Sequence, residues 1–296
     1  MDTLIVAVIL VMLGLVLGSF SGAQVWRLRA RQLSKDKEAG EQVDHDEYHR
    51  LRKLVRPLST DRSECLHCHH RLAWYDMVPL VSWVTLRGRC RYCRAQIGTM
   101  EPLMESGLAI AFGLSYLYWP FGLNGSLEWI RFGLWLVAMV LMAILFAYDT
   151  RWSLLPFGIN VALIVVSAVF FATNSIISPL QVGDWLSLLG ALGILAGLYY
   201  IFSLPGWVGL GDSILGVGLA LLLMRWERAF LALFLANLAG SLMLLPLAAR
   251  HKLTRGLHIP FGPFLILGAW IALLWGDAII SFALSWSGIL ANPFMV

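Results

Sequence analysis

The chain has 296 residues, of which 59% are hydrophobic and only 14% are charged, and its formal net charge is +4. Together with a mean hydropathy of +0.74, this composition excludes an ordinary soluble domain and predicts a membrane protein with several spanning helices. The basic residues are concentrated between Arg27 and Arg94, where acidic residues are also frequent. The charge therefore indicates orientation in a membrane and not binding to nucleic acid.

The first apolar run covers roughly residues 3–26 and ends in Trp26-Arg27-Leu28-Arg29, an aromatic and basic pattern that is typical of a membrane interface. The stretch before this run carries only Asp2, whereas a cleaved signal peptide begins with a basic region. We therefore expect a permanent anchor whose N-terminus lies outside the cell membrane and whose basic end lies in the cytoplasm.

A polar segment follows, at about residues 27–102, and it holds all four cysteines of the chain. Disulfides form in oxidising compartments, but a basic loop belongs on the cytoplasmic side, so the cysteines favour a metal site. Four thiolates suit tetrahedral zinc in a closed structural site that has no open position for catalysis. The cysteines form the pairs Cys65-x-x-Cys68 and Cys90-x-x-Cys93.

We expect zinc to fold this segment, and the first alternative is that the thiols bind no metal. A second alternative is that a neighbouring histidine replaces one cysteine as a ligand, although a solvated histidine close to the site is the simpler interpretation. The neighbouring histidines are His67, His69 and His70.

Seven further apolar runs follow the polar segment, at roughly residues 103–119, 127–148, 154–173, 184–204, 212–224, 229–248 and 261–288. With the first run, they predict an all-α polytopic membrane protein with about eight transmembrane helices and a zinc-stapled cytoplasmic insertion. A bilayer core needs about 20 residues of helix, so the run at 212–224 is short. Because Gly209 and Gly211 precede it, we expect it to start inside the bundle and to line a site.

With the N-terminus outside, four connections become cytoplasmic: 27–102, 150–151, 205–211 and 249–260. The outer connection at 174–183 contains no Lys or Arg, as the positive-inside rule requires. The last cytoplasmic connection contains Arg250, His251, Lys252 and Arg255. On this topology, Asp149 ends the third span and Asp212 opens the sixth span at the same face.

Two carboxylates at one face of a membrane protein suit the hydrolysis of a peptide bond. One carboxylate accepts a proton from the attacking water, while the other, protonated, polarises the carbonyl. The glycines before Asp212 would let an extended peptide approach the backbone. The alternative is that each Asp caps a helix, but Asp149 lies at a C-terminal end, where the helix dipole disfavours a negative charge.

Four motifs then occur in an order that resembles type IV prepilin peptidases, which are bifunctional leader peptidases and N-methyltransferases of the Gly-x-Gly-Asp aspartic protease group. These motifs are Tyr148-Asp149, Leu154-Leu155-Pro156, Gly209-Leu210-Gly211-Asp212 and Ile259-Pro260-Phe261-Gly262-Pro263. The polar segment resembles the same family. Its motifs are Trp74-Tyr75-Asp76-Met77-Val78-Pro79-Leu80-Val81-Ser82-Trp83, Leu86-Arg87-Gly88-Arg89-Cys90, Pro102-Leu103 with Glu105, and, before it, Gly18-Ser19-Phe20 with Arg27.

The resemblance implies an intramembrane aspartic endopeptidase of the bacterial cytoplasmic (inner) membrane, with Asp149 and Asp212 as its catalytic pair at the cytoplasmic face. The enzyme would remove the leader from type IV prepilins or pseudopilins. It would then methylate the new N-terminus with S-adenosylmethionine. The chain would divide into a first span (1–26), a zinc-binding segment associated with methyl transfer (27–102) and a seven-span peptidase domain (103–296).

The resemblance also implies roles for four residues around the catalytic pair. Gly209, Gly211 and Glu105 would contact the substrate, and Arg27 and Glu105 would serve methyl transfer. For Glu105, an interfacial carboxylate that reaches toward water is an equal alternative. Whether the products serve pili, secretion or DNA uptake stays open.

The sequence departs from the family pattern at three places. Ser21-Gly22-Ala23 replaces the usual Leu-Asn-Val, Phe157 replaces an Asp, and Ile214 replaces a Lys. The missing Asn motivates one alternative, a peptidase without methyltransferase activity. Another is a transporter that uses the two Asp as a proton or cation relay, but the cysteine insertion and the absence of an obvious inverted repeat disfavour it.

Overall fold

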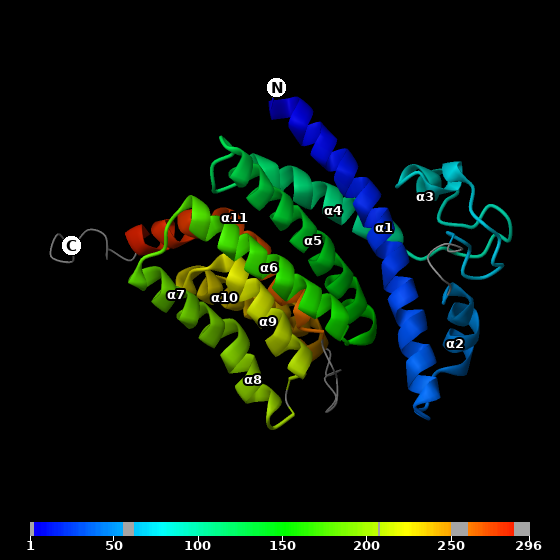
Figure 1. Cartoon of the computed structure of the whole chain (residues 1–296). Helices are drawn as coiled ribbons and strands as arrows, with labels where there is room; N and C mark the ends of the chain where they lie inside the picture. Colours follow the sequence, from blue (N-terminus) through cyan, green and yellow to red (C-terminus); the bar gives the residue numbers. More distant parts are fainter. Residues whose placement is uncertain (1–2, 56–61, 207, 250–259, 287–296) are drawn as a thin grey trace. The chain divides into compact units, whose positions relative to one another are not determined.

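The computed structural model describes residues 3–55, 62–206, 208–249 and 260–286, and within these ranges the only β-structure is two isolated bridges in the cysteine segment (Figure 1). The prediction of an all-α fold is therefore confirmed. The chain divides into two compact units, Met1–Leu117 and Tyr118–Val296. The basic residues predicted in the last connection lie outside the described residues.

The first unit consists of two long helices and a polar segment between them. Helix α1 (Thr3–Glu38) continues well past the predicted interface at Trp26, and its last turn carries Lys35 and Lys37, which favour a helix C-terminus. The polar segment contains the short helices α2 (His45–Leu51) and α3 (Val81–Thr85). Helix α4 (Met100–Leu117) completes the unit and packs along α1.

A stripe of glycines brings α1 and α4 into backbone contact. A Cβ atom on Gly14 would lie 2.6 Å from the Cα of Ala109, and one on Gly18 would lie 2.5 Å from the Cα of Glu105. Small residues four apart allow this close approach between membrane helices. Gly22 continues the stripe, but a Cβ there would make only an ordinary van der Waals contact of 3.8 Å with Glu101 and Met104 of α4.

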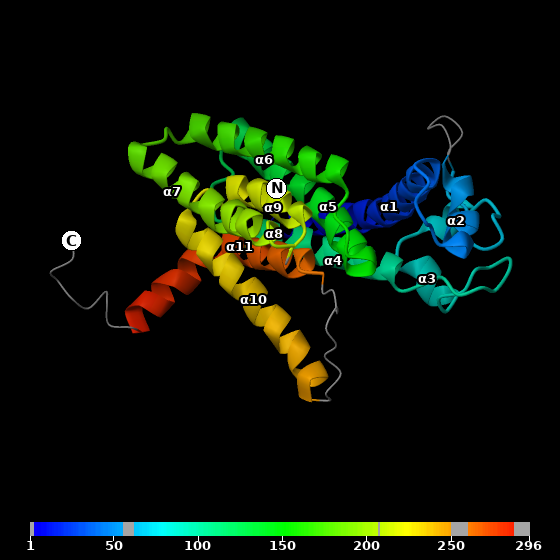
Figure 2. The same ribbon diagram turned by 90° about the horizontal axis from the view of Figure 1, so that it is seen from below.

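The second unit is a helical bundle that starts with α5 (Ser126–Trp152) and α6 (Phe157–Ile177). Helices α7 (Val182–Leu192) and α8 (Leu198–Ser203) are joined by one turn of π-helix at Gly193–Gly197. Helix α9 (Leu210–Leu223) follows and packs against α6, α7, α8 and the π-helical turn. Helices α10 (Trp226–Ala249) and α11 (Gly262–Trp286) pack on each other, and Figure 2 shows them diverging toward the C-terminal end of α10.

Six helical segments within the described ranges are long and apolar enough to cross a membrane: α1, α5, α6, α7 with α8, α10 and α11. The predicted count of eight is not confirmed, because α9 has only 14 residues and α4 does not meet the same criterion. Nevertheless, α4 lies beside the apolar half of α1, from Trp26, which donates to Glu101, to Val11, which lies against Gly113. It therefore shares the depth of a spanning helix.

Charged residues at the end of the second unit away from Asp149 are held by partners. Arg228 donates to Asp277 at 3.1 Å through Nε, which joins α10 to α11. Arg131 is buried and donates to Asn174 at 2.8 Å, which joins α5 to α6.

We predict that Gly18→Leu destabilises the first unit, because the new side chain would collide with the backbone of α4. Overpacking of a tight contact costs about 1–3 kcal/mol, so the thermal unfolding temperature in detergent should fall clearly. Gly22→Ala is the matched control and should leave it unchanged, since its Cβ meets no atom closer than 3.8 Å. Equal tolerance of both changes would contradict the close packing of α1 on α4.

Candidate active site and metal centre

Asp149 is held near the C-terminal end of α5 by the start of α11. Its Oδ2 accepts a hydrogen bond of 3.0 Å from the backbone N–H of Gly262, the first residue of α11. The free N–H groups at a helix N-terminus favour a carboxylate, and Asp149 is only 4% exposed. A Cβ on Gly262 would lie 2.7 Å from the same oxygen, so the contact requires glycine.

The backbone around Asp149 turns sharply after the carboxylate. Ser153 ends α5 with a left-handed φ of 51°, and its N–H donates to the carbonyl of Asp149 at 2.8 Å. The chain then passes through Leu154-Leu155-Pro156 into α6. The turn thereby brings Leu155 against Gly211, where a Cβ would lie only 3.0 Å from the Cβ of Leu155.

Asp212 lies in the first turn of α9, whose start is fixed from two sides. Asn160 of α6, buried within the apolar bundle, donates to the carbonyl of Gly211 at 3.3 Å. Ser213 donates to the carbonyl of Ala196 at 2.9 Å, within the π-helical turn. Within the described part of the chain, Oδ1 of Asp212 is buried without a hydrogen-bond partner.

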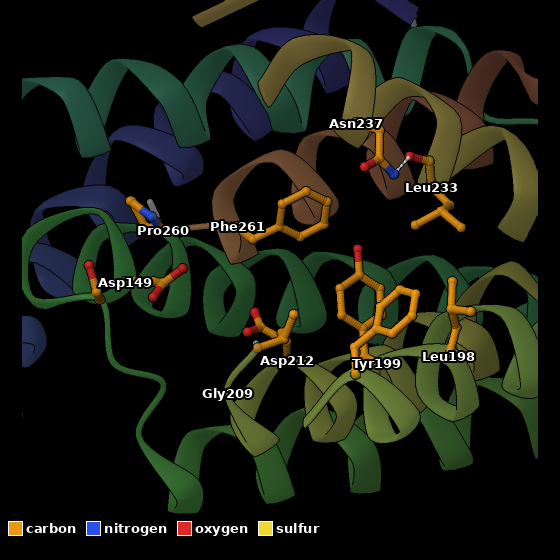
Figure 3. Close-up of a pocket in the computed structure, with 12 residues that line it drawn as sticks. Asp149, Leu198, Tyr199, Gly209, Asp212, Leu233, Asn237, Pro260 and Phe261 are labelled. Carbon is orange, nitrogen blue, oxygen red and sulfur yellow. Dashed lines mark hydrogen bonds between the residues drawn. The ribbon is translucent and has the colours of Figure 1, made fainter. Parts of the chain in front are cut away.

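Both aspartates line one cavity of about 370 Å³ in the second unit (Figure 3). They come from α5 and α9, and Asp212 lies within electrostatic range of Asp149. The remaining lining residues come from α5, α8, the segment before α9, α10 and the start of α11: Ser153, Leu198, Tyr199, Phe202, Val208, Gly209, Leu233, Asn237, Pro260 and Phe261. Asp149, Asp212 and Gly209 therefore line the same cavity, as the peptidase hypothesis requires.

Tyr199 and Asn237 are two of the lining residues that were not among the predicted site residues. Tyr199 is buried beside Phe261, with ring centroids 5.5 Å apart, and Figure 3 shows its hydroxyl directed toward α10. Asn237 of α10 donates to the carbonyl of Leu233 at 2.8 Å. A polar side chain inside an apolar run is the signal that could have found Asn237, and it would also have found Asn160.

Three of the residues predicted around the catalytic pair, Gly211, Glu105 and Arg27, do not line the cavity. Gly211 packs on Leu155, and neither Phe157 nor Ile214 lines the cavity. Glu105 and Arg27 belong to the first unit, where Glu105 is buried and accepts a hydrogen bond of 2.7 Å from the backbone N–H of Leu80.

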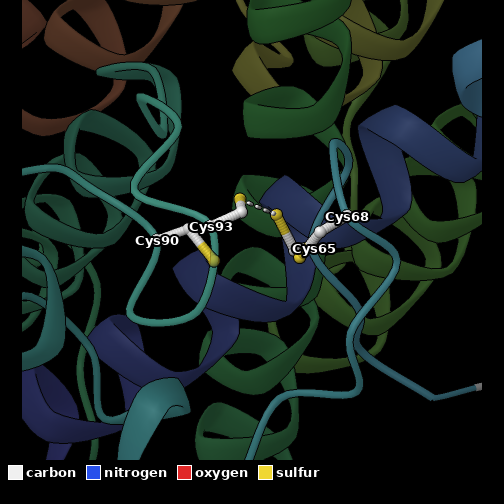
Figure 4. A group of neighbouring side chains, drawn as sticks. All are labelled: Cys65, Cys68, Cys90 and Cys93. Carbon is white, nitrogen blue, oxygen red and sulfur yellow. Dashed lines mark hydrogen bonds between the residues drawn. The ribbon is translucent and has the colours of Figure 1, made fainter.

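The four cysteines form one cluster in the first unit (Figure 4). Their sulfur atoms all lie within 4.8 Å of one another, so the cluster could hold a metal ion. The two pairs have the same local geometry. The N–H of His69 donates to the carbonyl of Cys65 and that of Arg94 to Cys90, and both donors have a left-handed φ, of 56° and 60°.

Two of the nearby histidines have other contacts. Nδ1 of His69 lies 3.5 Å from Oε1 of Glu64, and the ring of His70 lies against that of Tyr92, with 3.6 Å between centroids. The structure therefore groups the four cysteines without a histidine.

Asp76 braces the polar segment independently of the cysteines. It accepts hydrogen bonds from Nε of Arg91 at 2.8 Å and from the hydroxyl of Tyr92 at 3.0 Å. Burial raises the pKa of Asp76, but these hydrogen bonds and the one from the N–H of Ala73 outweigh it and lower the pKa below its ordinary value. Asp76 is therefore ionised at neutral pH and keeps its contacts with Arg91 and Tyr92.

Comparison with known proteins identifies relatives of this chain. The family model described as the bacterial peptidase A24 N-terminal domain matches residues 12–119. The prepilin leader peptidase/N-methyltransferase of Aeromonas hydrophila is 32% identical, over 75% of this chain and 74% of its own length. Those of Pseudomonas aeruginosa (29% identical, 94% and 93%) and Burkholderia pseudomallei (31%, 90% and 84%) match more of the chain. No solved structure matches.

We predict that the purified protein contains a metal ion and that Cys90→Ser removes it, because Cys90 is a buried member of the cluster. The metal content can be measured by inductively coupled plasma mass spectrometry. His67→Ala serves as a control, since His67 lies beside the first pair but outside the cluster. Retention of metal by Cys90→Ser, or its loss from His67→Ala, would contradict this ligand set.

Proposed function

Because the chain belongs to the family of prepilin leader peptidases/N-methyltransferases, we propose that it cleaves the leader peptide from type IV prepilins or pseudopilins and methylates the new N-terminal residue. The observation that supports the peptidase best is the placement of Asp149 and Asp212 on the wall of one cavity. This arrangement also disfavours the alternative that each carboxylate merely caps its own helix.

The surroundings of the two carboxylates suggest different catalytic roles, with Asp149 as the general base and Asp212 as the protonated acid. Asp149 accepts a backbone hydrogen bond through Oδ2, which stabilises a carboxylate that takes a proton from the attacking water. Oδ1 of Asp212 lacks a donor within the described residues, so Asp212 is the better position for the shared proton. That proton polarises the scissile carbonyl and later passes to the leaving amine.

Two glycines of the Gly-Leu-Gly-Asp motif serve different purposes in this proposal. Gly209 lines the cavity with extended backbone dihedrals (φ −71°, ψ 143°), so a substrate strand can lie along it. Gly211 makes room for Leu155 and thereby positions the start of α9. We therefore assign substrate contact to Gly209 and packing to Gly211.

Methyl transfer belongs to the first unit in this proposal. S-adenosylmethionine would supply the methyl group, and the four cysteines would hold a structural zinc that keeps the polar segment folded. Glu105 already accepts a hydrogen bond from the N–H of Leu80, so we propose that Glu105 positions this segment and that Arg27 of α1 serves methyl transfer. The glycine at position 22 leaves the peptidase-only alternative to experiment.

We propose the bacterial inner membrane as the location, with the N-terminus outside and the active site at the cytoplasmic face. Apolar helices and the named relatives support an inner-membrane protein with several spans. The orientation rests on the distribution of Lys and Arg, including basic residues in the last connection. Prepilins and membrane lipid are the expected partners.

We predict that Asp149→Asn and Asp212→Asn each abolish prepilin processing, with a loss of about 10²–10⁴-fold or more for removal of an acid–base group. The assay coexpresses candidate prepilins and resolves precursor from mature pilin. Asp184→Asn is the matched control, because Asp184 caps α7 by accepting from the N–H of Gln181 and does not line the cavity.

Processing by either dyad variant would refute the catalytic pair. Labelled S-adenosylmethionine in the same assay separates the alternatives: cleavage without label transfer identifies a peptidase alone. The relay alternative instead requires Asp149→Asn to block ion flux while processing continues.

We also predict that Gly262→Ala reduces processing although the protein still folds. The new Cβ would lie 2.7 Å from Oδ2 of Asp149 and displace the carboxylate, and a displacement of about 1 Å at a reacting group can cost about 10²-fold. Gly276→Ala, in the same helix, should process normally, because its nearest contact is the flexible side chain of Arg228 at 3.4 Å. Full activity of Gly262→Ala would contradict the assigned role of this contact.

A further inference from the structure

The packing of α4 on α1 fixes the depth of Glu105. Its Cα lies against Gly18, which precedes Trp26, the residue predicted at the membrane interface, by eight residues. At 1.5 Å per residue, Gly18 lies about 12 Å along the helix from Trp26, toward the middle of the membrane. The hydrocarbon layer of one bilayer leaflet is about 15 Å thick. The backbone of Glu105 therefore lies well inside the level of Trp26, toward the middle of the membrane.

Glu105 brings part of the polar segment to the same level. The N–H of Leu80 donates to its Oε2 at 2.7 Å, and Leu80 has a left-handed φ of 57°, a conformation that a leucine adopts only where its surroundings hold it. Helix α3 begins at the next residue. In Figure 1, α2 lies beside the C-terminal part of α1. Helix α3 lies beside a part of α1 that is closer to the N-terminus.

The residues around Leu80 expose large apolar side chains. Trp74 is 76% exposed, Val84 is 64% exposed and Val81 is 58% exposed, and Tyr75 and Met77 are exposed as well. Five such side chains within a short segment would form a costly apolar surface in water. Trp and Tyr next to aliphatic residues are typical of segments that lie in the membrane interface.

The charges that surround this apolar surface are positive. Arg87 and Arg89 follow α3 directly and are exposed, as are Arg71 and Arg94. The two acidic residues between positions 62 and 98 are both engaged, Glu64 with His69 and Asp76 with Arg91 and Tyr92. The outward charge of the segment therefore complements anionic lipid headgroups.

We propose that the segment from Trp74 to Thr85 is inserted in the lipid leaflet on the Trp26 side of the membrane. Its apolar side chains lie among the acyl chains below the headgroups, and Arg87 and Arg89 extend to the phosphates of anionic phospholipids. The segment is thus a second membrane anchor, held at its depth by the hydrogen bond from Leu80 to Glu105. This inference does not depend on either proposed enzymatic activity.

Photo-crosslinking of the full-length protein tests the insertion. A benzophenone amino acid replaces Val84 in protein reconstituted into nanodiscs of phosphatidylethanolamine and phosphatidylglycerol, and intact-mass spectrometry detects phospholipid adducts. Phe20, exposed in the apolar half of α1, is the positive control. Glu41, exposed beyond the end of α1, is the negative control. Val81 provides a second test position if the Val84 variant fails to fold.

Lipid adducts at Val84 comparable to those at Phe20, with only background at Glu41, are the expected result. Unreacted probe or protein adducts alone at both Val81 and Val84 would overturn the proposal, and a protein adduct would identify a protein partner instead. The Val84 adducts should favour phosphatidylglycerol over phosphatidylethanolamine, and this preference should be lost in Arg87→Gln/Arg89→Gln protein. An unchanged preference would overturn the assignment of these arginines to lipid phosphates.

Discussion

The hydrogen bond from the N–H of Gly262 to Asp149 is the contact on which the candidate active site depends. It joins the end of α5 to the start of α11, two elements separated by most of the second unit in sequence. A carboxylate in an apolar bundle needs such a donor, because an unpaired charge there is costly. The carboxylate lies so close to Gly262 that a side chain there would collide with it. One residue therefore both positions Asp149 and supplies its hydrogen bond.

The second carboxylate is positioned by a different device. Helix α9 is pinned at its start by Asn160 and by Ser213, and Gly216 fits so close to the π-helical turn that a Cβ would lie 2.0 Å from the carbonyl oxygen of Leu195. A π-helical turn shifts the backbone hydrogen-bond register, and such turns are frequent at functional sites. Here the turn supplies the carbonyl of Ala196 that holds Ser213.

The sequence predicts the main elements of this arrangement well, because long apolar runs and the Asp-containing motifs mark helix ends directly. The sequence predicts a span in the region of α4, but α4 does not meet the hydropathy criterion for a spanning helix. Its two glutamates, Glu101 and Glu105, lower its mean hydropathy. Both glutamates accept a hydrogen bond within the unit, Glu101 from Trp26 and Glu105 from Leu80. Tertiary hydrogen bonds of this kind are invisible to a hydropathy average.

The supporting residues of the cavity are harder to predict for a related reason. A lone Asn or Tyr in an apolar helix has several uses, and only the fold decides between them. Tyr199 and Asn237 reach the cavity because α8 and α10 flank α9. Conversely, the spacing of Cys65, Cys68, Cys90 and Cys93 suffices to predict their cluster, because local turns place each pair and the metal-ligand pattern joins them.

The shortness of α9 bears on how water reaches a reaction inside a membrane. Its 14 residues extend about 21 Å, whereas a hydrocarbon core is about 30 Å thick. The far end of α9 is followed by Arg225, which lies near Asp277 in the charged cluster, so that end belongs at a membrane surface. The opposite end, with Asp212, then stops short of the other surface. The resulting depression would let bulk solvent supply the hydrolytic water without a channel through the bundle.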